Sequence, residues 1–160
     1  MTVTLITGAN KGLGYETARR LLARGHTVYV GARKAELGEA AASELGGQFV
    51  QLDVTDDASV EAALGIIDER EGRLDVLVNN AGISATGDVT GPVALQVFDT
   101  NAVGIIRVTE AALPLLRNSG NPVVVNVEHQ TGSVPGWDIN QMALRSMWSG
   151  AAPLGCSATE

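Results

Sequence analysis

Five short apolar runs, rich in β-branched residues, recur along the chain. They occupy residues 3–7 (VTLIT), 27–31 (TVYVG), 49–53 (FVQLD), 75–79 (DVLVN) and 122–127 (PVVVNV). Apolar residues follow one another in these runs instead of alternating with polar ones, as in strands of a parallel sheet whose two faces are both covered. The pattern therefore predicts five buried strands.

Segments with the periodicity of amphipathic helices separate these strands. They lie at residues 14–25, 34–46, 59–72 and 101–120. Ser59 is the predicted N-cap of the third segment, and Pro114 is expected to bend or weaken the fourth. Because strands and helices alternate as far as Val127, the sequence predicts an α/β fold, a doubly wound, Rossmann-like parallel sheet. Such sheets bind ligands outside the carboxyl ends of their strands.

Composition and charge narrow the class of protein. The chain carries a formal net charge of −7 without a cluster of Lys or Arg, which argues against binding to nucleic acid or anionic membranes. Its single cysteine, Cys156, cannot form an internal disulfide, and its first residues lack the pattern of a signal peptide. No apolar segment approaches the length of a membrane-spanning helix. These features predict a cytoplasmic protein, and we predict no metal site.

A glycine-rich segment, TGANKGLG at residues 7–14, lies between the first strand and the first helix. Gly8 permits a sharp turn, Gly12 allows the backbone to approach a phosphate, and Gly14 permits close packing of the helix. The helix that follows offers unpaired N–H groups and the positive end of its dipole to a pyrophosphate. The alternative is a turn with a purely structural role. The predicted cofactor-binding residues of this segment are Gly8, Asn10, Lys11, Gly12, Leu13 and Gly14.

Four ordered motifs together resemble the short-chain dehydrogenase/reductase family. They are TGANKGLG (7–14), LDVTD (52–56), NNAG (79–82) and TNAVG (100–104), in which Asn101 opens the last predicted helix. The resemblance covers residues 1–127 and implies about five strands in the order 3-2-1-4-5. It also implies that Asp53 and Val54 approach the adenine, and that Asn80, Ala81 and Gly82 line the floor beside the cofactor.

The end of the second strand favours NADP(H) over NAD(H). The strand runs into VGARK and has no Asp or Glu at its tip to hold a ribose 2′-hydroxyl. Arg33 stands there instead, with Lys11 in the glycine turn, and two cations near one ribose suit a 2′-phosphate. In the alternative interpretation, both are ordinary solvated charges.

The catalytic residues of the family have no match in this chain. The resemblance implies a Ser after the fifth strand, a Tyr about thirteen residues later and a Lys four residues after it, and these positions hold His129, Met142 and Ser146. The Tyr donates or accepts the proton of the carbonyl or alcohol, the Lys lowers its pKa, and the Ser steadies the substrate oxygen. All tyrosines and lysines of the chain are Tyr15, Tyr29, Lys11 and Lys34. We therefore expect weak or no turnover, and any activity to be NADP(H)-dependent oxidoreduction.

Two residues remain as catalytic candidates. Asn101 takes part in a proton relay in the family, but without the Lys its expected role is local hydrogen bonding in the last helix. His129 is an acid–base candidate because imidazole titrates near neutral pH, although the adjacent Glu128 would point to the opposite face of an extended chain. The alternative for His129 is a surface or hydrogen-bonded histidine.

The composition changes at Glu128. We expect residues 1–127 to form the NADP-binding domain and residues 128–160 to be a divergent tail of the same domain, with a helix over 138–150 that covers the sheet. Family members continue with further strands that this sequence lacks. The fifth strand is thus expected to be an exposed edge, and self-association into a homo-oligomer is expected to hide it. The alternative function is a non-catalytic nucleotide-binding or interaction scaffold, produced by truncation or a frame shift near codon 128.

Overall fold

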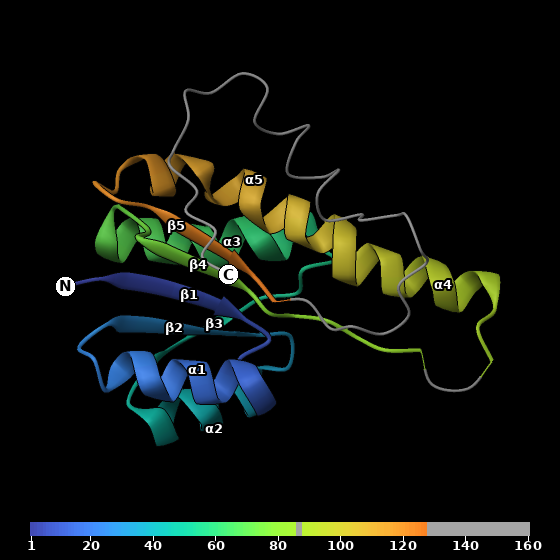
Figure 1. Ribbon diagram of the computed structural model, residues 1–160. Coiled ribbons are helices and arrows are strands. Elements are labelled where there is room, and N and C mark those ends of the chain that lie inside the picture. Colours follow the sequence, from blue (N-terminus) through green and yellow to red (C-terminus); the bar gives the residue numbers. More distant parts are fainter. Residues whose placement is uncertain (86–87, 128–160) are drawn as a thin grey trace, which may run out of the picture.

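A five-stranded parallel sheet forms the centre of the computed structural model, which describes residues 1–85 and 88–127 (Figure 1). The strands are β1 (Val3–Thr7), β2 (Thr27–Ala32), β3 (Gln48–Gln51), β4 (Val76–Asn79) and β5 (Val123–Asn126). They lie in the order β3-β2-β1-β4-β5, with Leu5 of β1 in register between Tyr29 of β2 and Leu77 of β4. The predicted doubly wound sheet and its strand order are confirmed.

Helices cover both faces of this sheet. The covering helices are α1 (Gly12–Leu22), α2 (Ala35–Leu45), α3 (Asp57–Glu71) and α5 (Gly104–Arg117), and a further helix, α4 (Gly91–Phe98), has no buried residue. Figure 1 shows α1 and α2 on one face and α3 and α5 on the other. Successive residues of β1 point to opposite faces, so Leu5 packs in one core cluster with Ile67 and Val108, and Ile6 packs in the other with Ala18. The continuous apolar runs of β1, β2 and β4 thus reflect strands buried on both sides, whereas the prediction of buried strands is wrong for β5 and for much of β3.

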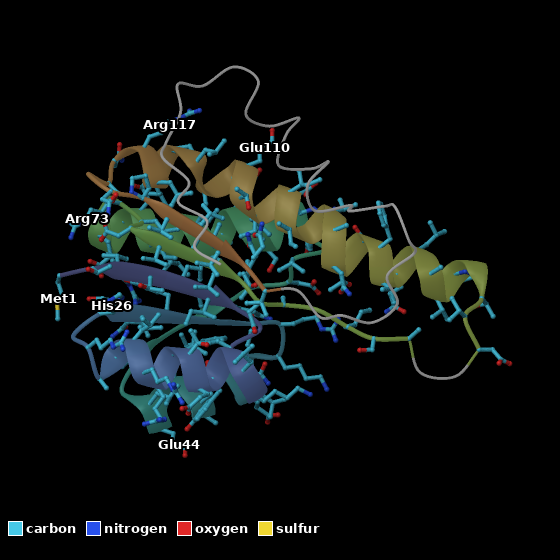
Figure 2. The ribbon with its side chains drawn as sticks, in the orientation of Figure 1. Met1, His26, Glu44, Arg73, Glu110 and Arg117 are labelled. Carbon is cyan, nitrogen blue, oxygen red and sulfur yellow. The ribbon has the colours of Figure 1, made fainter. Side chains whose placement is uncertain are left out.

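Charged side chains lie on the outer surfaces of these helices. In Figure 2, Glu44 of α2 and Glu110 and Arg117 of α5 point away from the sheet. All three are exposed. No helix in the described part of the chain is both long enough and apolar enough to cross a membrane.

Two details of the predicted helices are wrong. Helix α3 begins two residues before Ser59, because Asp56 is its N-cap and accepts a hydrogen bond from the Ala58 N–H at 3.0 Å. Asn101 does not open a helix, since it lies inside a π-helical segment, η1 (Asp99–Val103), that joins α4 to α5. The sequence interpretation had no element at α4, which begins with Pro92 in its first turn.

Apolar side chains remain exposed at β5 and α4. Val123, Val124 and Val125 of β5 are 42%, 36% and 42% exposed, and none of the residues of α4 is buried. Within residues 1–85 and 88–127, β5 forms an edge of the sheet. The covering helix predicted over 138–150 lies outside the described residues.

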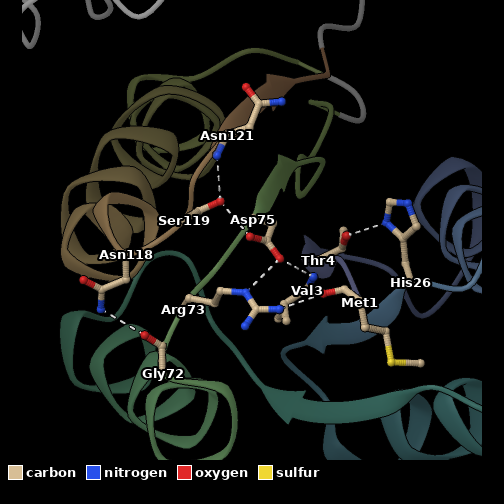
Figure 3. A network of polar contacts seen from close by, with 10 residues as sticks. All are labelled: Met1, Val3, Thr4, His26, Gly72, Arg73, Asp75, Asn118, Ser119 and Asn121. Carbon is tan, nitrogen blue, oxygen red and sulfur yellow. Dashed lines mark hydrogen bonds and ion pairs between the residues drawn. The ribbon is translucent and has the colours of Figure 1, made fainter.

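A polar network ties the chain together at the amino ends of the strands (Figure 3). The Asp75 carboxylate accepts hydrogen bonds from the Val3 N–H at 2.7 Å and the Ser119 hydroxyl at 2.6 Å, and Arg73 Nε lies 3.3 Å away. Arg73 also donates to the Met1 carbonyl at 2.8 Å. One carboxylate thus joins the start of β1 to the connections before β4 and β5.

Asp75→Asn is expected to lower the free energy of unfolding by about 1–2 kcal/mol at pH 7, since hydrogen bonds to a charged acceptor are stronger than neutral ones. Burial raises the pKa of Asp75, but the bonds from Ser119, Val3 and Arg73 lower it by more, so the net pKa lies below its ordinary value. A lowered folded-state pKa means that this stability is present above about pH 4 and is lost as the pH falls through the folded pKa. Urea unfolding at pH 7 and pH 3 should show the difference between variant and native chain shrinking in acid. An equal difference at both pH values would contradict a role for the charge.

Candidate functional site

The glycine turn stands at the carboxyl end of β1, between this strand and α1. Gly8 and Gly12 have φ angles of +64° and +62°, a region that side-chain-bearing residues rarely adopt. A Cβ atom on Gly14 would lie 2.4 Å from Asn80 Nδ2 and 2.9 Å from the Gly8 carbonyl oxygen. The turn therefore needs glycine at Gly8 and Gly12 for backbone conformation and at Gly14 for space.

The turn is fastened to the NNAG segment, more than 70 residues away in sequence. The Thr7 hydroxyl accepts hydrogen bonds from the N–H groups of Asn80 at 3.0 Å and Ala81 at 2.9 Å. In return, Asn80 Nδ2 donates to the carbonyls of Thr7 at 2.9 Å and Gly8 at 3.1 Å. Two segments selected on sequence grounds are thus one bonded unit, and the buried Thr7 is a member that the sequence interpretation missed.

The amino end of α1 is open to a ligand. Its N-cap, Lys11, makes no side-chain cap hydrogen bond, and the first turn contains no acidic residue. Lys11, Gly12 and Leu13 are all exposed. An uncapped helix start with exposed N–H groups and no negative charge is suited to an anion.

Arg33 lies directly after β2, beside the end of β3. Its side chain is exposed, and its backbone carbonyl accepts a hydrogen bond from Gln51 Nε2 at 3.2 Å. Neither Arg33 nor Lys11 forms an ion pair with the residues that the structure describes. Within the described residues, neither the Arg33 guanidinium nor the Lys11 ammonium is thus in an ion pair with a carboxylate. Both residues lie at the carboxyl ends of the strands, near the glycine turn.

The segment after β3 is ordered by its own side chains. Asp53 Oδ1 accepts hydrogen bonds from the N–H and the hydroxyl of Thr55 at 3.0 and 2.7 Å, and the Asp53 N–H donates to Ser59 Oγ at 2.9 Å. Ser59 therefore supports this segment from inside α3 instead of capping the helix. Burial raises the pKa of Asp53, but the Thr55 bonds and the charges of Arg33 and Arg107 outweigh it and keep the pKa below its ordinary value. Asp53 is ionised at neutral pH.

Asn101 bonds across to the chain that follows NNAG. Its Oδ1 accepts from the Ile83 N–H, and its Nδ2 donates to the Ile83 carbonyl, both at 2.9 Å. The prediction of hydrogen bonding within its own helix is therefore wrong. A Cβ on Gly82 would lie 3.5 Å from Asn101 Oδ1, which is ordinary contact. The side chain fixes the path of residues 82–83 over η1.

Two further polar groups near the site had no place in the sequence interpretation. Asn79 Nδ2 donates to the Thr109 hydroxyl at 3.0 Å and to Asn126 Oδ1 at 2.9 Å, which joins β4 to α5 and β5. Arg107 of α5 contacts Val54, Asp57 and Asp99. In the sequence, Arg107 is a charged residue between Ile106 and Val108 in a largely apolar helix, and this position is the feature that could have identified it.

His129, Met142 and Ser146, which occupy the family's catalytic positions, lie outside the described residues. Asn101 is thus the one catalytic candidate that the structure places. In residues 1–85 and 88–127, no group of three His, Cys, Asp or Glu side chains is arranged to hold a metal ion.

Known proteins are similar to this chain in sequence. The model of the short chain dehydrogenase family matches residues 2–140. Short-chain dehydrogenase anuI of Penicillium roqueforti is 37% identical over 144 residues, which are 82% of this chain and 57% of that protein. Serine 3-dehydrogenase of Agrobacterium fabrum is 40% identical over 139 residues, which are 82% of this chain and 55% of that protein.

A solved structure is similar to this chain in both fold and sequence. A variant of actinorhodin polyketide ketoreductase with NADPH superposes with a TM-score of 0.77 at 34% identity, over 83% of this chain and 56% of that one. The chain therefore spans little more than half the length of the proteins it matches.

Proposed function

Because this chain belongs to the short-chain dehydrogenase family, we propose that it binds NADP(H) and has weak or no oxidoreductase turnover by itself. The observation that carries the proposal is the uncapped amino end of α1, lined by glycines and free of acidic residues in its first turn. A dinucleotide pyrophosphate there receives backbone N–H groups and the positive end of the helix dipole.

The strand order supports a placement for each half of the cofactor. With the pyrophosphate over β1, the adenosine extends over β2 and β3, and the nicotinamide over β4. Arg33 and Lys11 then hold the 2′-phosphate, Asp53 and Val54 lie beside the adenine, and Asn80, Ala81 and Gly82 form the floor on the nicotinamide side. Asn10 and Leu13 complete the turn around the phosphates. The NADPH in the related ketoreductase structure supports this choice of cofactor.

Carbonyl reduction needs a proton as well as the hydride that NADPH supplies. Tyr29 is fully buried and donates to Glu71 at 3.0 Å, and burial and this carboxylate raise its pKa. Desolvation and the neighbouring Glu44 also raise the pKa of Tyr15. A phenol that holds its proton more tightly is a poorer acid, so neither tyrosine suits the task. Among the residues that the sequence interpretation selected, His129 could still serve as the acid, and it lies outside the described residues.

The exposed apolar side chains favour a second candidate, a nucleotide-binding interaction scaffold. Val89, Leu95 and Phe98 are 71%, 71% and 48% exposed around α4, in addition to the valines of β5. Exposed apolar groups of this extent commonly serve as contact surfaces. Under this proposal the chain forms a homo-oligomer through them and acts in the cytoplasm by binding, with the nucleotide fold as its frame.

Titration with NADPH and NADH, followed by turnover assays with aldehydes, ketones and quinones, tests the proposal. We expect NADPH to bind more tightly than NADH, and its absorbance to stay constant with every substrate. Turnover that disappears in His129→Ala would show instead that residues 128–160 supply a catalytic acid. Failure of both dinucleotides to bind would contradict the proposed function.

A further inference from the structure

We propose that Arg107 is a positioning residue of the dinucleotide site, which holds the Val54 backbone in place for the adenine half of the cofactor. The inference rests on the proposed function and adds to it a residue that touches no part of the cofactor. Arg107 belongs to α5, on the face of the sheet that α3 also covers.

Arg107 uses all three of its guanidinium nitrogens. Nη1 donates to the Val54 carbonyl, Nε donates to Asp57 Oδ1 at the start of α3, and Nη2 lies 3.3 Å from Asp99 Oδ1 in η1. Its side chain is only 19% exposed. A planar guanidinium with several partners has one preferred orientation, which a flexible ammonium lacks.

Val54 is held against α5 at two points. A Cβ on Gly104, one turn before Arg107, would lie 2.9 Å from Val54 Cγ2, so the helix touches the Val54 side chain where glycine leaves room. The carbonyl of the same residue is bonded to Arg107. Val54 is 7% exposed and shares a small hollow with Thr7 and Ala81, which belong to the bonded unit beneath the glycine turn.

Arg107 also balances the negative charge around this segment. Asp57 and Asp99 both pair with it, and its charge contributes to the lowered pKa of Asp53. Without Arg107 the Val54 carbonyl loses its donor, and the carboxylates lose a shared cation. The Asp53–Thr55 backbone would then keep its local bonds to Thr55, Ser59 and the Asp56 N–H and the contact of the Val54 side chain with Gly104, but it would lose the hydrogen bond that joins the Val54 carbonyl to α5. Since this backbone lies at the adenine side of the proposed site, the adenine half should bind less well.

The test compares Arg107→Gln with Arg73→Gln, a matched control. Arg73 is also a partly buried arginine paired with a carboxylate, Asp75, but it lies beside Met1 and Val3 at the amino ends of the strands (Figure 3). The probe is adenosine 2′,5′-bisphosphate, which represents the adenosine half alone. Its affinity is measured by calorimetry well below the lower Tm of the two variants, where each is fully folded.

We expect Arg107→Gln to weaken binding of the probe by about 3- to 30-fold, the range over which residues without ligand contact alter affinity. Arg73→Gln should lower Tm comparably and leave the affinity within about twofold of the native chain, since its contacts lie far from the site. Arg107→Lys should recover only part of the loss, because a lysine cannot serve three acceptors in one plane.

Equal affinities in Arg107→Gln and the native chain would overturn the positioning role, even if stability fell. An equal loss in Arg73→Gln would overturn it as well, because the effect would then follow stability alone. If the native chain binds NADPH but Arg107→Gln binds the probe normally, only this inference fails. If the native chain binds neither NADPH nor the probe, the proposed function fails with it.

Discussion

Gly14→Ala is expected to weaken NADPH binding by roughly 10- to 100-fold, the equivalent of one lost hydrogen bond to a charged group at about 1.5–3 kcal/mol. A methyl group at this position would lie 2.4 Å from Asn80 Nδ2, 2.9 Å from the Gly8 carbonyl and 3.0 Å from Ala9 Cα. Asn80 cannot move aside freely, since its Nδ2 holds the Thr7 and Gly8 carbonyls. The helix must therefore shift away from the turn, which misplaces the N–H groups proposed to hold the pyrophosphate.

The same substitution should lower the free energy of unfolding by about 1–3 kcal/mol, as overpacking usually does. Gly65→Ala in α3 is the matched control, because apart from the neighbouring backbone of its own helix nothing lies within 4 Å of the position of its Cβ. We expect this control to raise stability by about 0.5–1 kcal/mol, the cost of glycine in a helix interior, and to leave NADPH affinity unchanged. Calorimetric titration and urea unfolding measure both effects. A Gly14→Ala protein that binds NADPH like the native chain would contradict the proposed cradle.

The fold could be predicted from the sequence because its strongest signals are local. The runs at β1, β2 and β4 are apolar without alternation, and a sheet covered on both faces buries nearly all of their residues, whereas the equally apolar run at β5 remains exposed. The glycine turn was equally informative, since positive φ angles at Gly8 and Gly12 and close packing at Gly14 each demand the residue found there. The strand order came from the family resemblance and not from these patterns.

The missed features depend on contacts between distant segments. Helix α4 (GPVALQVF) is apolar on nearly all sides and therefore lacks the contrast between an apolar and a polar face that indicates an amphipathic helix, and η1 continues into α5 without a break in composition. Ser59 has a residue type that favours N-caps, but Asp56 stands three residues earlier and takes that role. The Ser59 hydroxyl instead accepts a hydrogen bond from the Asp53 N–H, a partner that helix propensity alone does not indicate.

For the site as well, the sequence revealed the local motifs but not the contacts between distant segments. The sequence identified TGANKGLG and NNAG as separate motifs, but the Thr7 hydroxyl that joins them is an ordinary polar residue in an apolar strand. Arg107 had no place in the sequence interpretation. The contacts of Arg107 depend on the fold, because the connection after β3 packs against α5, where the Val54 side chain contacts Gly104.

Arg33→Ala is expected to weaken NADPH binding by roughly 10- to 100-fold and to change NADH binding little. The guanidinium is exposed after β2 and forms no direct ion pair in the described part of the chain, although its charge acts on Asp53, so it is available to a 2′-phosphate in the proposed site. The loss of one charged hydrogen bond of about 1.5–3 kcal/mol corresponds to that range. Because NADH has no phosphate on this ribose, it should not respond to the change.

Lys34→Ala provides the control, since Lys34 is the adjacent exposed cation and makes no side-chain cap for α2. Each variant is titrated with both dinucleotides at low and high salt, because screening weakens long-range attraction more than a direct contact. We expect Lys34→Ala to alter NADPH affinity by less than about twofold at high salt, where only contact interactions persist. Equal losses in both variants would mean that general positive charge, rather than a bond from Arg33, attracts the phosphate. Parallel losses for NADPH and NADH in Arg33→Ala would instead place Arg33 at the adenine or the pyrophosphate, and the preference for NADP(H) would then need another source.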